Sequence, residues 1–391
     1  MKIRSVYLDN ITTTRPSEHT IGKMLSYLSE NWGAPSAPHQ MGQRVLPAVT
    51  EAYRSLYTLL GADEADTIVF TSSGTEAVNH VVRSVYYDHT RVSGKNHFLT
   101  AATDEAPSIL ALGRLEQLGC VAKMVSPVQD GYITAQQVAD ALTPRTILLS
   151  LSWANGLTGV VTPIHDIAEL CHERGVLLHL DATHVLGKLY FELPDIGADF
   201  ITFNGANLHG PRGSGGLWIK QGVKLSPFIV GGAQQGGFRA GDIDVPALVG
   251  MGHAALEALD ARDLVCTEVA RLRDRLEEGI VKAYPEAVIF HREQERVPHC
   301  TAIGFPGIAN EALLYALDRE QIYASMGGGH YQQIGLVLAA CGVPEGIAQS
   351  AVSFSLSRTT TEGEVDHAIE VIAATAKRLR RLSEYLIDKE V

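Results

Sequence analysis

The stretch Asp199-Phe-Ile-Thr-Phe-Asn-Gly-Ala-Asn-Leu-His-Gly-Pro-Arg-Gly213 carries the most informative pattern of this 391-residue chain. Residues 200–203 are apolar or β-branched without a break, which predicts a short strand buried on both faces. The segment after them contains glycines and a proline, which predicts a tight loop. The fold is therefore expected to be built from buried strands of this kind, each followed by a loop.

Similar apolar runs flank this stretch and alternate with helical patterns from about residue 65 to 220. Besides 200–203, the predicted strands are residues 67–72, 97–100, 120–125, 146–151, 177–181 and 216–219. The predicted helices between them include residues 76–87, 108–118, 135–142 and 164–173. This alternation predicts an α/β domain with a doubly wound, mostly parallel seven-stranded sheet.

The composition changes after residue 220, where a Gly-rich stretch at 231–237 precedes a long helical pattern at 245–284. Short strands are predicted at 288–291, 301–305 and 352–355. We therefore expect a large α/β domain over residues 15–250. A smaller α+β domain is expected to combine residues 1–14 with residues 251–391.

The overall charge and composition exclude several classes of protein. The formal net charge is -12 and no long run of Lys or Arg occurs, which argues against nucleic acid or an anionic membrane surface as a partner. No apolar window is long enough to span a membrane, and the first residues form no apolar signal region. The five cysteines lie far apart, so neither a disulfide framework nor a zinc site is expected. These features predict a cytoplasmic location.

Two polar segments stand at the ends of predicted strands. Ser72-Ser-Gly-Thr-Glu-Ala-Val-Asn79 opens a helix, where free backbone N–H groups suit a phosphate, although Thr75 could also serve as a simple helix cap. Asp181 ends the strand at 177–181. A carboxylate there could pair with a protonated ring nitrogen or cap the next turn. The two segments alone leave both readings open.

These segments belong to a series of motifs that resembles the NifS/IscS-like cysteine desulfurases, a branch of the class V aminotransferases. The family's opening Leu-Asp-Asn-x-x-Thr-Thr and its Ser-Gly-Thr-Glu turn, for example, have close counterparts here. In chain order the matching stretches are Leu8-Asp-Asn-Ile-Thr-Thr-Thr14, Asn31-Trp-Gly-Ala-Pro-Ser-Ala-Pro-His-Gln-Met-Gly42, Ser73-Gly-Thr-Glu76, Trp153-Ala-Asn-Gly-Leu-Thr-Gly159, Asp181-Ala-Thr-His184, Phe238-Arg-Ala-Gly-Asp-Ile-Asp-Val-Pro246 and Phe354-Ser-Leu-Ser-Arg-Thr-Thr-Thr361. The resemblance implies the fold type I of enzymes that depend on pyridoxal 5′-phosphate (PLP), and a homodimer.

The resemblance also implies roles for residues that match the family. Gly74 and Thr75 would meet the PLP phosphate, and Asp181 would pair with the pyridine nitrogen. Asn155 would lie beside the ring oxygen and the substrate carboxylate. Arg358 would bind that carboxylate through its planar fork of donors.

The departures from the family lie where its chemistry takes place. The family reads Ser-Gly-His-Lys before His-Gly-Pro, whereas this chain reads Asn204-Gly-Ala-Asn207. The Schiff-base lysine is therefore Asn207, and the phosphate-binding Ser and His are Asn204 and Ala206. A carboxamide nitrogen cannot add to an aldehyde as an amine does, because its lone pair is delocalised into the carbonyl. PLP is therefore expected only as a non-covalent ligand, if it binds at all.

Further departures concern groups around the ring. Ala106 stands where the family has its stacking histidine, and His184 where a glutamine contacts the ring oxygen. Asp242 replaces a threonine that reaches the phosphate from the partner subunit. The loop Ser325-Met-Gly-Gly-Gly-His-Tyr331 places His330 near the position of the catalytic cysteine and contains no thiol. The resemblance therefore implies a degenerate site without a competent catalytic residue.

Substitute groups are not expected to restore the chemistry. Lys188 matches a family lysine that does not form the Schiff base, and Lys220 follows a strand and is expected at the surface. The histidines at 179, 184, 209 and 330 could converge on a metal, but no His-x-x-x-His helix or carboxylate cluster accompanies them. No metal site is predicted.

Three functional classes remain open. The first is an inactive relative that binds a small anionic, amino-acid-like ligand, or a protein of sulfur or iron–sulfur metabolism. The second is an enzyme that acts on an amino acid and holds PLP or pyridoxamine phosphate non-covalently, with His184 or His330 as general base. The third is an enzyme with unrelated chemistry. We favour the first, because lysine, stacking histidine, phosphate ligands and cysteine are lost together. Asn155, Asp181 and Arg358 are retained, which is the main argument against it.

Overall fold

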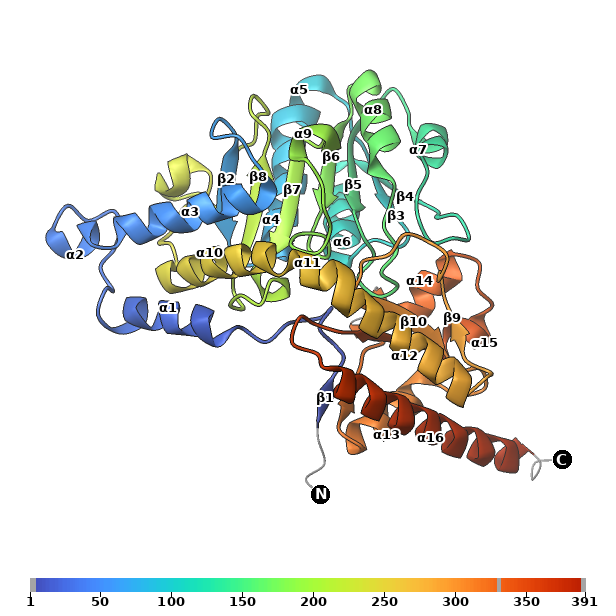
Figure 1. Ribbon diagram of the computed structural model, residues 1–391. Coiled ribbons are helices and arrows are strands. Elements are labelled where there is room, and N and C mark those ends of the chain that lie inside the picture. The colour runs from blue at the N-terminus through green and yellow to red at the C-terminus, as the bar shows by residue number, and fades with distance from the viewer. Residues whose placement is uncertain (1–4, 329–331, 388–391) are drawn as a thin grey trace.

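The computed structural model describes residues 5–328 and 332–387. Its centre is a seven-stranded sheet with the strand order β2-β8-β7-β6-β5-β3-β4, shown in Figure 1. In this sheet only β8 runs antiparallel to its neighbours, so the predicted mostly parallel seven-stranded sheet is confirmed. The strands are β2 (Thr67–Thr71), β3 (His97–Ala101), β4 (Val121–Val125), β5 (Thr146–Ser152), β6 (Leu177–Asp181), β7 (Phe200–Asn204) and β8 (Gly215–Ile219).

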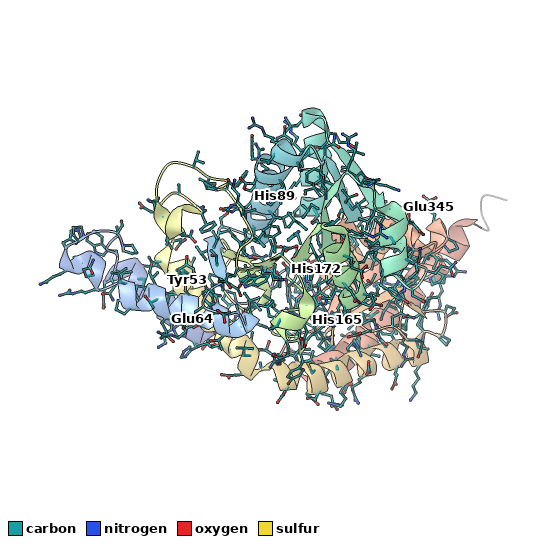
Figure 2. The ribbon with its side chains drawn as sticks, turned by 90° about the horizontal axis from the view of Figure 1, so that it is seen from above. Tyr53, Glu64, His89, His165, His172 and Glu345 are labelled. Carbon is teal, nitrogen blue, oxygen red and sulfur yellow. The ribbon has the colours of Figure 1, made fainter. Side chains whose placement is uncertain are left out.

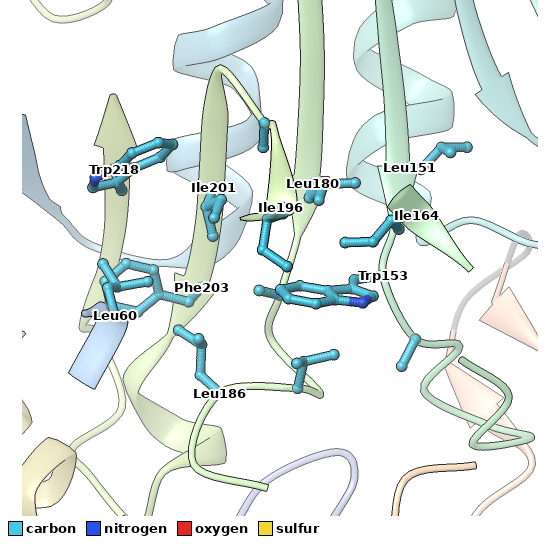
Figure 3. Close-up of a cluster of buried hydrophobic side chains, with 14 of the residues drawn as sticks. Leu60, Leu151, Trp153, Ile164, Leu180, Leu186, Ile196, Ile201, Phe203 and Trp218 are labelled. Atoms are coloured by element: carbon cyan, nitrogen blue, oxygen red, sulfur yellow. The ribbon is translucent and has the colours of Figure 1, made fainter. Parts of the chain in front are cut away.

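Helices cover both faces of the sheet. One face packs against α4 (Gly74–Val85) and α6 (Ala106–Leu115) through residues such as Val82 and Leu112. The other face packs against α8 (Ile164–Arg174) and α9 (Leu193–Ile196), and Figure 3 shows Trp153 among the side chains of this core. The outer side of α8 carries the exposed His165 and His172, labelled in Figure 2. Shorter helices in this part are α5 (Arg91–Ser93) and α7 (Ala135–Ala141), with a π-helical turn at Tyr86–Thr90.

The N-terminal helices form an arm beside the sheet. They are α1 (Glu18–Ser29), α2 (Gln40–Gln43) and α3 (Leu46–Leu60). Figure 1 shows α3 running beside α10 (Val245–Asp260), and α1 also packs on α10. The described helices include none long and apolar enough to cross a membrane.

The long helical pattern predicted at 245–284 is interrupted in the structure. The interruption is the single residue Ala261, which has φ -90° and ψ -2° and whose N–H still bonds to the carbonyl of Glu257. Beyond it follow α11 (Arg262–Leu264), a π-helical turn and α12 (Ala270–Ala283). Part of α10 beyond residue 250, including Met251 and Ala254, packs into the core of the large sheet.

The rest of the chain builds a smaller α+β part. Its sheet has the order β14-β10-β9, and its core joins residues from Val6 to Ala376. The elements are β1 (Val6–Tyr7), β9 (Val288–Ile289), β10 (Cys300–Gly304), α13 (Asn310–Arg319), β11 (Ile322–Tyr323), β12 (Gly327–Gly328), β13 (Gln332–Gln333), α14 (Ile334–Ala340), α15 (Glu345–Ala348), β14 (Ala351–Ser355) and α16 (Glu362–Ile387). Because β1 pairs with β11, the first residues join the last third of the chain.

Candidate functional site

A cavity of about 290 Å³, here called the main cavity, lies at the carboxyl edge of the large sheet. Its wall comes chiefly from the residues that directly follow β2, β3, β5, β6 and β7. Parallel strands bring their carboxyl ends to one edge, which is where open α/β sheets bind ligands. Residues 11 and 12, the hairpin residues Gly327 and Gly328, and Val337 close the other side. The volume suits a small molecule.

Asn207 lies in the short 3₁₀ turn Gly205–Asn207 after β7 and is almost fully buried. Its Nδ2 donates to the carbonyl of Ile11 at 2.7 Å, and its Oδ1 accepts from Asn204 Nδ2 at 3.2 Å. Both ends of the carboxamide are therefore engaged in the frame of the protein. At this position the side chain forms two structural hydrogen bonds and offers no amine.

The turn that opens α4 forms a second wall. Its helix cap is Ser73, whose hydroxyl accepts from the amide of Glu76 at 3.2 Å, so the alternative in which Thr75 is the cap is wrong. Gly74 and Thr75 line the main cavity. A side chain at Gly215 would lie 2.4 Å from the carbonyl carbon of Ser73, so glycine is required for β8 to pass behind this turn.

Asp181 lies at the end of β6 with 8% of its surface exposed, and it lines the main cavity. Its Oδ1 accepts from the amide of Thr183 at 3.0 Å, so it does hold the next turn, as one of the two sequence readings predicted. Burial raises the pKa of Asp181, and hydrogen bonds from Thr183 and the proximity of His184 oppose the shift. The carboxyl group thus combines a structural bond with a position on the cavity wall.

Asn155 also lines the main cavity, but its side chain is used to hold its own loop. Its Oδ1 accepts from the amides of Leu157 and Thr158, both at 2.9 Å. Its Nδ2 donates to the carbonyl of Thr103 at 2.8 Å. These bonds fix the loop after β5 against the loop after β3.

A pair of titratable side chains in the main cavity was missed from the sequence. His184 Nε2 lies 3.4 Å from Glu105 Oε1, and both residues line the cavity. A Cβ at Gly156 would lie 2.6 Å from His184 Nε2 and 2.8 Å from Glu105 Oε1, so a larger residue there would require the two side chains to move. The sequence does contain one signal for this pair. Gly156 and His184 both depart from the family motifs, which carry an asparagine and a glutamine at these positions.

A third carboxyl group, Asp104, stands behind this pair and lines the same cavity. It accepts hydrogen bonds from the Thr100 hydroxyl and from the amides of Ala101 and Ser152, all at 2.6–2.7 Å. Complete burial nevertheless raises its pKa to about 6. The described lining residues thus include three carboxyl groups and one imidazole, and no lysine or arginine.

The structure does not bring Arg358 into the main cavity. Its side chain lines a neighbouring pocket of about 30 Å³, here called the rear pocket, behind the turn that holds Asn207. There its guanidinium bonds to the carboxylate of Glu257 on α10. In this structure a protein carboxylate bonds to the guanidinium, and the pairing of Arg358 with a substrate carboxylate beside Asn155 stays a prediction.

Lys188 lies in the rear pocket as well. Its Nζ donates to the backbone carbonyl of Asn207 at 3.0 Å, and burial lowers its pKa to about 8. Lys220 is exposed at the end of β8. Neither lysine lines the main cavity, in line with the expectation that neither replaces the missing one.

The remaining site candidates are dispersed. Ala106 is the first residue of α6, where Pro107 and not Ala106 lines the cavity. Asp242 is exposed on the loop before α10. The prediction for His330 lies outside the described residues.

The predicted histidine candidates do not form a metal site in the described residues. His179 lies in the core of the sheet between Ser150 and Thr202, and burial lowers its pKa to about 3. His209 belongs to the rear pocket. Across residues 5–328 and 332–387, no group of three or more His, Cys, Asp or Glu side chains could hold an ion.

No cysteine is among the described lining residues of the main cavity. Cys300 contacts one lining residue, with its Sγ 3.6 Å from the carbonyl of Leu157, but it is buried and its pKa is raised to about 11. Cys341 is also buried, with a pKa raised to about 11. A thiolate, the reactive form of cysteine, is therefore disfavoured at both positions.

The doubly wound sheet, its crevice and the aspartate after β6 define the scaffold of PLP-dependent enzymes of fold type I. Residues 6–367 match the family described as aminotransferase class-V. Its relatives place the chain in the NifS/IscS-like cysteine desulfurase branch of that family. It is 36% identical over 384 residues to a cysteine desulfurase of Cereibacter sphaeroides, covering 97% of this chain and 98% of that protein.

Further comparisons agree with this membership. A cysteine desulfurase of Nostoc sp. is 34% identical over 387 residues, covering 98% of this chain and 96% of that protein. A solved structure described as a NifS-like protein superimposes with a TM-score of 0.90 at 28% identity, covering 96% of this chain and all of that chain. The predicted family and fold are thereby confirmed.

The residues of the main cavity do not fit covalently held PLP. Asp181 and the start of α4 match the ends of a pyridine ring and a phosphate, but Asn207 offers no amine, and its carboxamide is already bonded. The family's Ser, His and Lys around the phosphate are here Asn204, Ala206 and Asn207, none of which carries a positive charge. The cavity therefore holds no described residue that could form the Schiff base of the family's cofactor.

Proposed function

We propose that this chain is a relative of the cysteine desulfurases that is not a competent desulfurase and that binds a small ligand non-covalently in the main cavity. The observation that carries the proposal is the buried carboxamide of Asn207, tied to Ile11 and Asn204 at the position of the family's lysine. The absence of cysteine from the sequence at 325–331 supports it, because sulfur would have no acceptor there.

The test is reduction with borohydride after incubation with PLP, followed by intact-mass measurement. The Cereibacter sphaeroides relative serves as the positive control. We expect a reduced pyridoxyl adduct on the relative and none on this chain. An adduct on a lysine of this chain, or release of sulfide from cysteine at a rate near that of the relative, would refute the proposal.

A second candidate function is an enzyme that acts on an amino acid with PLP or pyridoxamine phosphate held non-covalently. The pair of His184 and Glu105 favours it, because an imidazole beside a carboxylate can hold or move a proton inside the cavity. The test is hydrogen exchange at the Cα of amino acids in heavy water with added cofactor. Exchange by the wild type that is lost in His184→Gln would support this candidate, and no exchange by the wild type would remove it.

We further propose that the protein is a cytoplasmic homodimer, with a protein of sulfur or iron–sulfur metabolism as a second class of partner. Support for dimerisation comes from an apolar stripe at helical spacing on α1 and the loop after it. Its members are Ile21, Leu25, Leu28 and Trp32, between 43% and 69% exposed. Light scattering after size exclusion tests this, with Leu25→Glu as the disrupting variant. A monomeric wild type would contradict it.

A further inference from the structure

The rear pocket is a second candidate binding site, separate from the main cavity. Its volume is about 30 Å³, and much of its wall is apolar, with Leu186, Val265 and Leu356 among the side chains. One water needs roughly 10–15 Å³ of cavity volume, so the pocket has room for a single small species and not for an organic ligand. The described residues that line it include no carboxyl group.

Lys188 brings a buried positive charge to this pocket. The residue is 8% exposed, and its Nζ donates to the carbonyls of Asn207 at 3.0 Å and Leu186 at 3.5 Å. An ammonium has three donors, so one N–H remains for another acceptor. Burial lowers its pKa to about 8, and no carboxylate among the described residues raises it, so most of the group is still protonated at neutral pH. A buried charge without a counter-ion is costly, which favours an anion beside it.

Glu257 does not supply that counter-ion. One of its carboxylate oxygens bonds to the guanidinium of Arg358, and the other accepts from the hydroxyl of Ser17 at 2.9 Å. It is also not among the residues that line the rear pocket, whereas Lys188 and Arg358 both are. This carboxylate therefore faces two cations, and it is bonded to the one that is not Lys188.

His299 gives the pocket a polar group that lacks a partner. The residue is 3% exposed and lines the rear pocket. Neither Nδ1 nor Nε2 has a hydrogen-bond partner among the residues that the structure describes. Burial lowers its pKa well below the usual value, and Lys188 and His184 add to the shift, so the ring is neutral and keeps one N–H donor. Buried donors are normally satisfied, and one acceptor in this small pocket could serve both His299 and Lys188.

We propose that the rear pocket binds one monovalent anion of the size of chloride, held by the remaining N–H of Lys188 and a ring N–H of His299. A water molecule fits the same volume, but it is neutral and leaves the ammonium without a counter-ion. The site goes beyond the proposed function, because it is independent of the ligand of the main cavity. Asn207 lines both spaces and its carbonyl holds Lys188, so the anion would stabilise the turn between them.

Bromide locates the site directly, because it resembles chloride and scatters anomalously. Crystals of the full-length protein are grown in potassium gluconate, whose anion is too large for the pocket, and are then soaked in bromide. We expect an anomalous peak in the rear pocket between Lys188 and His299. Density for water there without an anomalous peak would overturn the inference.

Thermal unfolding tests the same site in solution, with chloride replacing gluconate at constant ionic strength. An anion that binds only the folded protein should raise the melting temperature in a saturable way. At chloride ten times above its dissociation constant, the ratio of folded to unfolded protein should rise about elevenfold. Lys188→Met and His299→Phe should lose this response. Lys220→Met, which removes an exposed lysine, is the matched control and should keep it.

The comparison of Lys188→Met with the wild type adds a second readout. In gluconate the variant should be the more stable protein, and chloride should reduce its advantage, because the variant has no charge for the anion to offset. No chloride response in the wild type would overturn the inference. An equal response in both site variants would also overturn it, because the effect would then come from the protein surface. If either variant fails to fold, the bromide peak in the wild type decides.

Discussion

The two sides of the turn at residues 205–208 carry opposite charges. The main cavity in front of it presents Asp104, Glu105 and Asp181, whereas the rear pocket contains Lys188 and Arg358 together with His209 and His299. Both sets are largely buried, so their charges are weakly screened. Residues that are close in the fold can therefore act in different sites, because a backbone turn separates Lys188 and Arg358 from the carboxyl groups of the main cavity.

Charges on the two sides of the turn can be changed one at a time. Two unit charges about 4 Å apart interact by about 4 kcal/mol at an effective dielectric constant of about 20. A substitution that adds a charged group in front of the turn, or removes a titratable group from either side, should therefore have a measurable effect. Four such changes follow in order of expected size.

The largest effect is expected for a substitution that restores the family's lysine on the main-cavity side of the turn. Asn207→Lys supplies an amine but leaves Ala106, Ala206 and the loop at 325–331 without the family's histidines and cysteine. Because each deficit affects a different step, repair of one leaves the others limiting. We expect sulfide and alanine release from cysteine to stay at least about a thousandfold below that of the Cereibacter sphaeroides relative, when both are supplied with PLP and a reductant. Turnover within about tenfold of the relative would show that the charge division does not disable the site.

The second change tests the structural role of a front carboxylate. Asp104→Asn replaces an acceptor of three hydrogen bonds by a group that can accept fewer, so donors from Thr100, Ala101 and Ser152 cannot all be satisfied. We expect a loss of about 2–4 kcal/mol in the free energy of unfolding, measured with urea. Asp130→Asn, at an exposed site, is the control. A loss no greater than that of the control would mean that the three bonds contribute little.

The third change removes a cation from the rear. Lys188→Met eliminates an ammonium whose pKa burial lowers to about 8, so we expect stabilisation by about 1–2 kcal/mol at neutral pH after the loss of its bond to Asn207. The sign follows from the shift. A lysine with a depressed pKa costs stability as pH falls from about 10.5 through 8, so the wild type should gain stability between pH 8 and 10.5 and the variant should not.

Urea midpoints at neutral and alkaline pH measure this effect. Lys220→Met, which removes an exposed lysine, is the matched control and should leave the midpoint unchanged. Destabilisation of Lys188→Met at neutral pH would show that the ammonium is well solvated or paired in the rear pocket, contrary to the division of charge described above.

The smallest effect concerns acid pH. Burial lowers the pKa of His209 to about 4, and Arg358 adds to the shift, so protonation opposes folding as pH falls from about 6.5 toward 4. His209→Asn removes the titration and suits the positive φ of 62° at this residue. We expect the variant to gain about 1 kcal/mol relative to the wild type on going from about pH 8 to pH 5, measured by melting temperature. An unchanged difference between the two pH values would contradict a cationic rear pocket.

The sequence predicted the frame of the site because strand and loop patterns are local. The apolar runs that became β2 to β8 and the polar residues directly after them, such as Asp181 and Asn204, were visible in the sequence. Parallel strands bring their carboxyl ends together, so these residues had to meet. Family motifs then assigned them to one cavity, and Gly74, Thr75, Asn155, Asp181 and His184 do line it.

What the sequence could not provide were pairings between distant segments. Arg358 turns to Glu257, which lies 101 residues away in the chain and has no motif of its own. The pairing of His184 with Glu105 depends on the space left by Gly156, a relation among three loops. The one-residue interruption at Ala261, between α10 and α11, coincides with no glycine or proline in the sequence. Each of these features depends on tertiary packing, which the periodicity of the sequence does not reveal.

The bond between Asn207 and Ile11 has a consequence for the order of events in folding. It joins residues separated by 196 positions, and Thr14 adds a further bond from its hydroxyl to the carbonyl of Ala206 at 2.7 Å. Closing so long a loop costs entropy that must be offset by earlier contacts, so this wall of the main cavity is expected to assemble late. Nascent chains and partly folded intermediates would then lack the cavity, and ligand binding would report only molecules in which residues 11–14 have docked.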